Sequence, residues 1–319
     1  MIQVSDLHRR AQACLAETGG NPKKLILFHT VIALGSSFLL TVINYVFSLL
    51  IADTGGLGGL SARSVLTTIQ IGLELAVWIA LPVWQAGLFY VALGWSNKEA
   101  ASFSRLLQGF RRTSSVLGGL LLRGMVFFAL SIPVCYVSSA IFALTPFSEP
   151  LLELLAPLME QPEQAEALLT DAFANAVTEA AIPLFILFAV LYIVVAIPFF
   201  CRLRFTDFAV MEGLTAGKAL LKSLVITKGQ FRQVLMLDLS FWWFYLLQAL
   251  SVAICYGDAI LSAAGIVLPL SPVVSSLLFL ALGAVCQGVL LWQYEAKRVT
   301  AYALTYRSLS GATTPEEQP

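Results

Sequence analysis

The chain is poor in charge and in histidine. Charged side chains make up 12% of its 319 residues, and only two residues are histidines; soluble domains average roughly 25% charged residues. The five cysteines are scattered and include no Cys-x-x-Cys pair, so the sequence predicts neither a zinc site nor a disulfide framework. A net charge of zero gives no overall attraction to nucleic acid. We therefore expect no cofactor, no metal and no nucleic-acid partner.

The motifs of common enzyme active sites are also missing. The sequence contains no His-Glu-x-x-His, no Gly-x-Ser-x-Gly, no phosphate-binding loop and no Gly-x-Gly-x-x-Gly in a strand–helix context. An intramembrane aspartyl protease needs two aspartates at matching depth, whereas Asp238 and Asp258 lie at opposite ends of one apolar run. A serine–histidine dyad would have to use His29, near the edge of the first run. We therefore expect a protein that is not an enzyme.

Long apolar runs dominate the chain. Its hydrophobic fraction is 58% and its mean hydropathy is +0.83. About 20 consecutive apolar residues form a helix long enough to cross the hydrocarbon core of a bilayer. The runs predict an all-α, polytopic membrane helix bundle with six transmembrane helices. These spans are Leu25–Ile51, Ile71–Trp95, Leu117–Ala143, Ile182–Cys201, Val234–Tyr256 and Pro272–Trp292.

Basic residues gather on one side of these six spans. Of the 19 Lys and Arg residues, all except Arg63 precede the first span, follow the last, or lie between or at the edges of spans two and three or four and five. The positive-inside rule makes that side cytoplasmic. We expect a multi-pass protein of the bacterial plasma membrane with both termini in the cytoplasm.

An amphipathic segment precedes the first, third and fifth spans. In the second of these segments Phe103, Leu106 and Phe110 recur at helical spacing, which predicts a short helix with one apolar face. The recurring order of amphipathic helix, basic break and two spans indicates one unit that occurs three times. The units are 1–96, 97–202 and 203–308, within one membrane domain 1–308 that is followed by a disordered polar tail, 309–319.

Two interpretations of these amphipathic helices stay open. They could lie in the inner membrane interface, where each basic residue near anionic lipid contributes about 1 kcal/mol. Alternatively, they pack under the bundle as elbows. The first interpretation makes membrane lipids a partner, with four candidate headgroup contacts: Arg105, Arg112, Lys218 and Lys222.

An acidic insertion separates the third and fourth spans. Residues 148–180 contain seven carboxylates and no basic residue. Pro162 suits the first turn of a helix, and the apolar residues that follow it recur at helical spacing. The pattern predicts an extracellular helical hairpin. It is either a solvated cap on the bundle or a surface that binds a protein partner.

Polar side chains within the spans are candidates for function. Asp238 lies twenty residues, about 30 Å of helix, from Asp258, which places it at the inner interface within reach of Arg232 and Arg204. Four amides lie deeper, and such amides often join helices by hydrogen bonds. They either join helices or line a polar path: Asn44, Gln85, Gln248 and Gln287.

The last third of the chain resembles a known family. The stretches "RLRFTDFAVMEG" and "GKALLKSLVITKGQFRQVLMLDLSFWW" combine a basic-aromatic start, a helix with Ser223, a break at Lys228-Gly229, and Leu239-Ser240-Phe241 at the start of a span. Together with "SFSRLLQGFRR" and the N-terminal helix, they resemble an uncharacterised bacterial integral-membrane family, numbered 975 among the domains of unknown function. The resemblance implies a multi-span bacterial membrane protein, and it assigns no catalytic residue.

These patterns favour a non-enzymatic accessory or scaffold protein, which acts through membrane lipids and the acidic hairpin. The alternative is a transporter of a small or amphipathic solute, with a polar path through the helix bundle. A polar cavity shared by the four amides would favour transport, and a solid apolar centre would exclude it.

Overall fold

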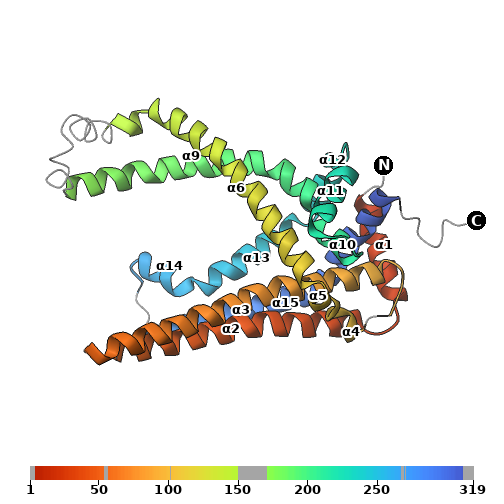
Figure 1. The fold of residues 1–319 in the computed structure, drawn as a ribbon, viewed down its shortest axis with the longest axis horizontal. Coiled ribbons are helices and arrows are strands. Elements are labelled where there is room, and N and C mark those ends of the chain that lie inside the picture. Colours follow the sequence, from red (N-terminus) through yellow and green to blue (C-terminus); the bar gives the residue numbers. More distant parts are fainter. Residues whose placement is uncertain are drawn as a thin grey trace, which may run out of the picture. The chain divides into compact units, whose positions relative to one another are not determined.

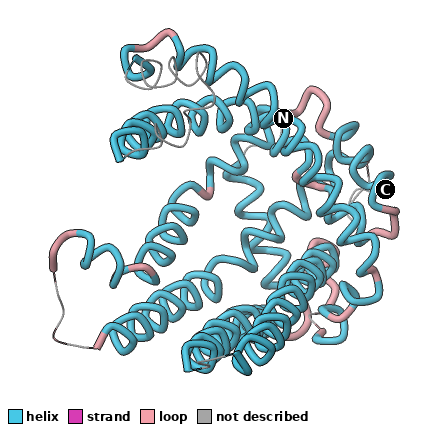
Figure 2. The backbone as a smooth tube through the Cα atoms, turned by 60° about the vertical axis from the view of Figure 1, so that its left-hand side comes forward, coloured by secondary structure: helices cyan, strands magenta, loops and turns pink. Residues whose placement is uncertain are grey.

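A computed structural model of the chain describes residues 4–53, 57–100, 102–149, 171–266, 269 and 271–311. Within these ranges the regular elements are helices, and no strand occurs (Figure 2). Five of the described helices are long and apolar enough to cross a membrane, or six if one bent pair counts as a single span. The prediction of an all-helical protein with several apolar helices of membrane-spanning length is therefore confirmed.

The long helices extend beyond the spans predicted from hydropathy. The last of them continues for eighteen residues past Trp292, where the predicted span ends, because its later turns bury a second set of side chains against protein. The five helices are α2 (Pro22–Asp53), α3 (Leu57–Trp95), α6 (Thr113–Ala143), α9 (Asp171–Leu203) and α15 (Pro272–Ser310).

The fifth predicted span is broken. It consists of α12 (Phe231–Ser240) and α13 (Trp242–Cys255), which are bent by 53° relative to each other. The Oγ of Ser240 donates to the carbonyl of Leu237 at 2.6 Å, a back-bonding geometry that bends helices. The bend places Phe241 against the ring of His8, with centroids 4.7 Å apart.

The described chain divides into two compact units, one of residues 1–119 and 205–319, the other of residues 120–204. In the second unit Tyr192 Oη donates to the carbonyl of Phe127 at 3.3 Å, which joins α9 to α6.

Shorter helices connect the long ones. They are α1 (Val4–Glu17), α4 (Phe103–Leu106), α5 (Gln108–Arg111), the 3-10 turn η1 (Pro146–Ser148), α10 (Thr206–Met211), α11 (Ala216–Ile226) and α14 (Gly257–Ala263).

The larger unit is built around α15. Figure 1 shows α2 and α3 alongside this helix, and α13 and α1 also pack on it. We call the end of this unit that carries α1, α4, α5, α10, α11 and the last turns of α15 the basic end. Its core side chains are fully buried, as Trp95, Phe205 and Tyr306 show with 0% exposure. Along the apolar spans large side chains are exposed instead, such as Trp78 at 73%, as expected for surfaces that face lipid.

The amphipathic helices differ in how they pack. The apolar face of α1, with Leu7 and Ala11 buried, packs on α15 and α12, as the elbow interpretation expects. Before the third span the chain forms the two short helices α4 and α5 in place of one. They are pressed against α3 so closely that a Cβ atom at Gly109 would lie 2.1 Å from the carbonyl oxygen of Val83. Before the fifth span the expected helix is α11.

Parts of two predictions lie outside the described residues. These are residues 150–170 of the expected extracellular hairpin and residues 312–319 of the expected tail. Residues 171–180 of the insertion form the first turns of α9 and are continuous with the span. The threefold repeat and the sidedness of the membrane stay predictions.

We predict that Gly283→Ala destabilises the protein. A Cβ atom at Gly283 would lie 2.3 Å from Cys255 Sγ and 2.7 Å from the carbonyl oxygen of Ser251, so α13 and α15 would have to separate. Such overpacking costs about 1–3 kcal/mol, which should lower the Tm of the purified protein by several degrees. Gly288→Ala is the matched control on the same helix, because its nearest neighbour, Leu34, is 3.5 Å away. Equal Tm values for the two variants would contradict the close contact.

Candidate functional site

A cavity of about 430 Å³ lies among α2, α3, α13 and α15, within the size range of small-molecule sites. Three of the four predicted intramembrane amides line it, namely Gln85, Gln248 and Gln287. We call it the polar cavity. Its other lining residues are His29, Thr30, Ala33, Leu34, Ser37, Leu81, Pro82, Trp84, Leu291, Glu295 and Arg298.

Helical periodicity brings these residues to one place. On α15, Gln287, Leu291 and Glu295 follow each other at intervals of four, so they share one face. On α2, His29, Ala33 and Ser37 have the same spacing. Each of these helices therefore presents one partly polar stripe to the cavity.

A buried ion pair forms one end of the polar cavity. Arg298 donates to Glu295 through Nε at 2.8 Å and through Nη2 at 2.7 Å. Only 14% of the arginine side chain and 4% of the glutamate side chain are exposed. Two parallel hydrogen bonds of this kind fix geometry as well as charge. Because the two charges cancel, this end of the cavity offers polar atoms without a net charge.

A chain of hydrogen bonds leads from this ion pair to Asp238. Tyr302 Oη donates to Asp238 Oδ1, so the oxygen of Tyr302 is left to accept from Tyr245 Oη, 3.0 Å away. Tyr245 in turn lies 3.5 Å from Arg298 Nη1. The hydrogen bond from Tyr302 therefore connects Asp238 to α15.

The two arginines predicted to pair with Asp238 lie in different settings. Arg232 is exposed. The guanidinium of Arg204 stands 5.1 Å from the ring of Phe200 in the second unit. Pairing of either arginine with Asp238 stays a prediction. Within the larger unit, Asp238 accepts a hydrogen bond from Tyr302.

Two buried polar atoms in the cavity wall have no hydrogen-bond partner among the described residues. They are His29 Nε2 and Thr30 Oγ1, on residues that are 5% and 2% exposed. The His29 ring stacks on Trp84 at 5.6 Å, and Trp84 Nε1 donates to the His29 carbonyl at 3.2 Å. An unsatisfied buried polar atom costs about 1–3 kcal/mol, so such atoms usually meet water or a ligand. Hydrogen bonds from ordered water or from a bound molecule would satisfy these two atoms.

Asn44 lies apart from the other three amides. Its Nδ2 donates to Glu74 Oε1 at 2.8 Å, and Gln70 Nε2 approaches the same oxygen at 3.3 Å. This amide joins α2 to α3 by a hydrogen bond, which is the structural interpretation of the four amides.

A second cavity, of about 420 Å³, is formed by α2, α13, α14 and α15 farther from the basic end. Asp258 lines it and accepts hydrogen bonds from Ser275 and, at 2.8 Å, from Ser276; these bonds hold the pKa of Asp258 below its usual value. Leu280 of this cavity and Gln287 of the polar cavity are two turns, roughly 10 Å, apart on α15. Gly283, where α13 touches α15, lies between them.

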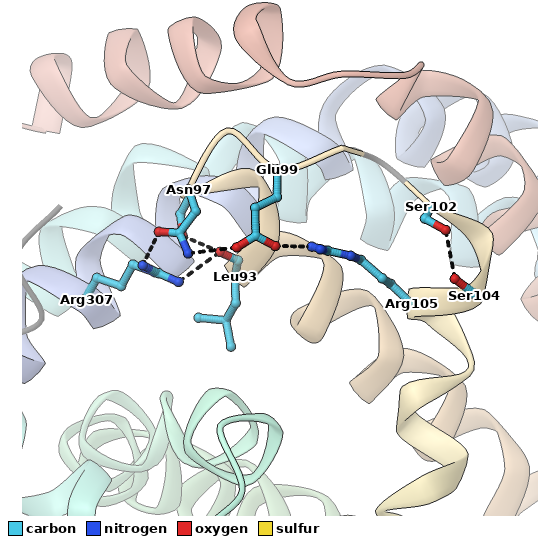
Figure 3. A network of polar contacts seen from close by, with 8 residues as sticks. Leu93, Asn97, Glu99, Ser102, Ser104, Arg105 and Arg307 are labelled. Atoms are coloured by element: carbon cyan, nitrogen blue, oxygen red, sulfur yellow. Dashed lines mark hydrogen bonds and ion pairs between the residues drawn. The ribbon is translucent and has the colours of Figure 1, made fainter. Parts of the chain in front are cut away.

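Three of the four candidate headgroup contacts bind other parts of the protein. Arg105 pairs with Glu99 (Figure 3). Arg112 donates to the Val210 carbonyl at 2.9 Å, and Lys222 pairs with Glu212 at 2.7 Å. Lys218 is exposed, so it is the candidate best placed to reach a lipid headgroup.

The Glu99 contacts belong to a network at the basic end. Burial alone would raise the pKa of Glu99, but hydrogen bonds from Arg105 and Asn97 hold it below its usual value. Arg307 donates to Asn97 Oδ1 and, at 3.1 Å, to the Leu93 carbonyl. Figure 3 shows how these contacts connect the end of α15 to the turn that follows α3. The network fixes the last turns of α15, beyond the ion pair of Glu295 and Arg298.

Sequence reasoning missed His29 and Thr30 as lining residues, and it missed the ion pair of Glu295 and Arg298. The spacing of Gln287, Glu295 and Arg298 on one helical face was the signal that could have found the ion pair. No comparable signal marks His29 and Thr30, because they stand in an apolar run.

We predict that Glu295→Gln lowers the Tm far more than Glu99→Gln. The first change leaves the charge of Arg298 buried without its partner, which costs about 3–5 kcal/mol. The pair of Glu99 and Arg105 is open to solvent, with 43% and 32% of the side chains exposed, and a pair of that kind contributes at most about 1 kcal/mol. Thermal unfolding of the purified variants at neutral pH measures both effects. A loss at Glu295 no larger than that at Glu99 would contradict the buried pair.

The described residues contain no cluster of three or more His, Cys, Asp or Glu side chains that could hold a metal ion. No protein-family model matches the chain, and neither a curated protein nor a solved structure matches it.

Proposed function

We propose that the chain is a membrane transporter that binds a small polar solute in the polar cavity. The observation that supports it is one cavity lined by three amides and by two unpartnered polar atoms, among helices apolar enough to span a membrane. Polar groups removed from water cost free energy unless they are hydrogen-bonded. A cavity of this composition is a reason to prefer transport to a purely structural role.

The cavity wall favours a solute without net charge. Each glutamine amide offers two donors and an acceptor, while the charges of Glu295 and Arg298 neutralise each other. The solute is therefore expected to carry several hydrogen-bonding groups, either neutral or zwitterionic. Apolar wall residues such as Leu34 and Leu291 would contact a short apolar part of it.

The two cavities support a path. They follow each other along α2, α13 and α15, with the contact at Gly283 between them. Transporters expose a site to one side at a time by moving one group of helices against another. A small displacement of α13 from α15 at Gly283 would join the cavities, and the absence of a side chain there lets the helices close again.

The accessory or scaffold role is a second proposal. It depends largely on the acidic insertion as a surface for a protein partner, and residues 150–170 of that insertion lie outside the described residues. For either role we propose cytoplasmic termini, on the distribution of basic residues. We propose a bacterial plasma membrane on the family resemblance, and a non-enzymatic protein on the missing active-site motifs. Membership of the family numbered 975 stays a prediction from the last third of the chain.

Water access to the polar cavity is the first test. In a background whose five cysteines are replaced by serine, we expect Gln287→Cys to react at least about tenfold faster than Leu282→Cys with a charged methanethiosulfonate reagent. The reason is that this reagent modifies thiols in water, and Leu282, on the same helix, is 51% exposed on an apolar face. Labelling from each side of sealed vesicles shows which side the cavity opens to. Equal, slow labelling at both positions would exclude a hydrated cavity.

Transport is tested separately. Cells that express the wild-type chain or Gln287→Leu are given a mixture of isotope-labelled amino acids, polyols, sugars and inorganic ions, and uptake is followed by mass spectrometry. We expect one class of net-neutral solute to differ between wild type and variant, while ion uptake is unchanged. Identical uptake of every compound, with Gln287→Cys labelled, would leave a hydrated cavity but contradict transport of these solutes.

A further inference from the structure

A third cavity, of about 540 Å³, lies at the basic end among α1, the first turn of α2, the bend at Phe241 and α15. It is on a different side of α15 from the polar cavity, with Trp292 and Lys297 in its wall in place of Gln287 and Glu295. The amides of Gln12 and Gln293 also line it. Nothing in the proposed transport path uses this cavity.

Two lysines supply its charge. Lys23 and Lys297 both line the cavity, and neither forms an ion pair within the described residues. The lining residues include no carboxylate. Like charges that converge on one space repel each other, so the arrangement favours an anion between them.

His8 adds a polar side chain to the wall of this cavity. Its Nε2 lies 2.9 Å from Ser240 Oγ, and its ring stacks on Phe241. Burial lowers the pKa of His8, and the charge of Lys297 lowers it further. His8 and Lys297 both line the cavity, so a hydrogen-bonding ring and a positive charge share its wall.

The aromatic wall of the cavity is typical of a membrane interface. Trp243 and Trp292 line it, and Lys23 Nζ stands 5.8 Å from the centroid of the Trp292 ring. Tryptophans concentrate at the headgroup level of bilayers. One turn beyond these residues the helices expose apolar side chains, with Leu27 at 46% and Val289 at 54%.

We propose that this cavity binds the phosphate group of an anionic phospholipid, held between Lys23 and Lys297 with its acyl chains along the exposed apolar faces of α2 and α15. Basic pockets between membrane helices bind anionic lipid headgroups in this way. The apolar faces that continue from the cavity favour a lipid over a soluble phosphate compound. The bound lipid would join α1 and the bend at Phe241 to the membrane.

The test uses the full-length purified protein and native mass spectrometry. Phosphatidylglycerol is the probe, and phosphatidylcholine is the zwitterionic comparison. We expect the double variant Lys23→Gln/Lys297→Gln to bind phosphatidylglycerol roughly tenfold more weakly than wild type. The matched control is Lys24→Gln/Lys228→Gln, which removes the same charge from exposed lysines outside the cavity and should bind as wild type does. Tm values of both double variants check that they fold.

Four outcomes would overturn the proposal. Equal binding of the two lipids, or an equal loss in the control variant, would show that no selective phosphate site exists. A folded Lys23→Gln/Lys297→Gln protein that keeps wild-type affinity would show that these lysines do not hold the headgroup. Displacement of phosphatidylglycerol by millimolar inorganic phosphate or glycerol 3-phosphate would assign the cavity to a soluble phosphate compound instead.

Discussion

The ion pair between Glu295 and Arg298 is the interaction on which the larger unit depends. A guanidinium and a carboxylate at this degree of burial are tolerated only together, and their helix, α15, contacts α1, α2, α3 and α13. Arg298 also stands 5.1 Å from the ring of Phe244 and 5.8 Å from that of Tyr302. One residue thus connects the polar cavity, the broken span and the chain of tyrosines that ends at Asp238.

The two parts of α15, before and after Trp292, differ in how far their side chains are exposed. Before Trp292, α15 carries exposed apolar residues and the amide of Gln287. After Trp292 many of its side chains are buried, with Val299, Ala303 and Tyr306 fully covered. The polar cavity lies where the two parts meet, and the cavity with Lys23 and Lys297 lies near the same level on another side. Solute binding and lipid binding would therefore act on the same stretch of α15.

Hydropathy was sufficient to predict the long helices, because a lipid bilayer demands apolar runs of a certain length. It could not predict the bend at Phe241, since the bend comes from side-chain contacts of Ser240 and His8 rather than from a proline or glycine. Whether Gln85, Gln248 and Gln287 line the same cavity depends on the rotation of three helices about their axes. The hydropathy pattern does not give this rotation. The same limit explains why Asn44, which looked equivalent, joins Glu74 instead.

The alternatives drawn from the sequence are now unequal. Three of the four amides line one cavity, as the interpretation of a polar path expects. The fourth, Asn44, joins two helices instead. The interfacial interpretation of the amphipathic helices is weaker, because α1 packs on protein and Arg105, Arg112 and Lys222 have protein partners. Lipid contact by basic residues is better supported at Lys23 and Lys297, which line one cavity. Helical periodicity could not predict this pair, because the two lysines stand on different helices, α2 and α15.

The central claim is that a water-filled polar cavity lies inside helices whose outer faces contact lipid. Hydroxyl-radical labelling of the protein in lipid nanodiscs tests it most directly, because the radicals form in water and oxidise side chains that water touches. Leu291 lines the cavity, while Leu282, on the same helix, is on an exposed apolar face. The account predicts faster oxidation of Leu291 than of Leu282. Oxidation of Leu282 at an equal or greater rate would contradict it.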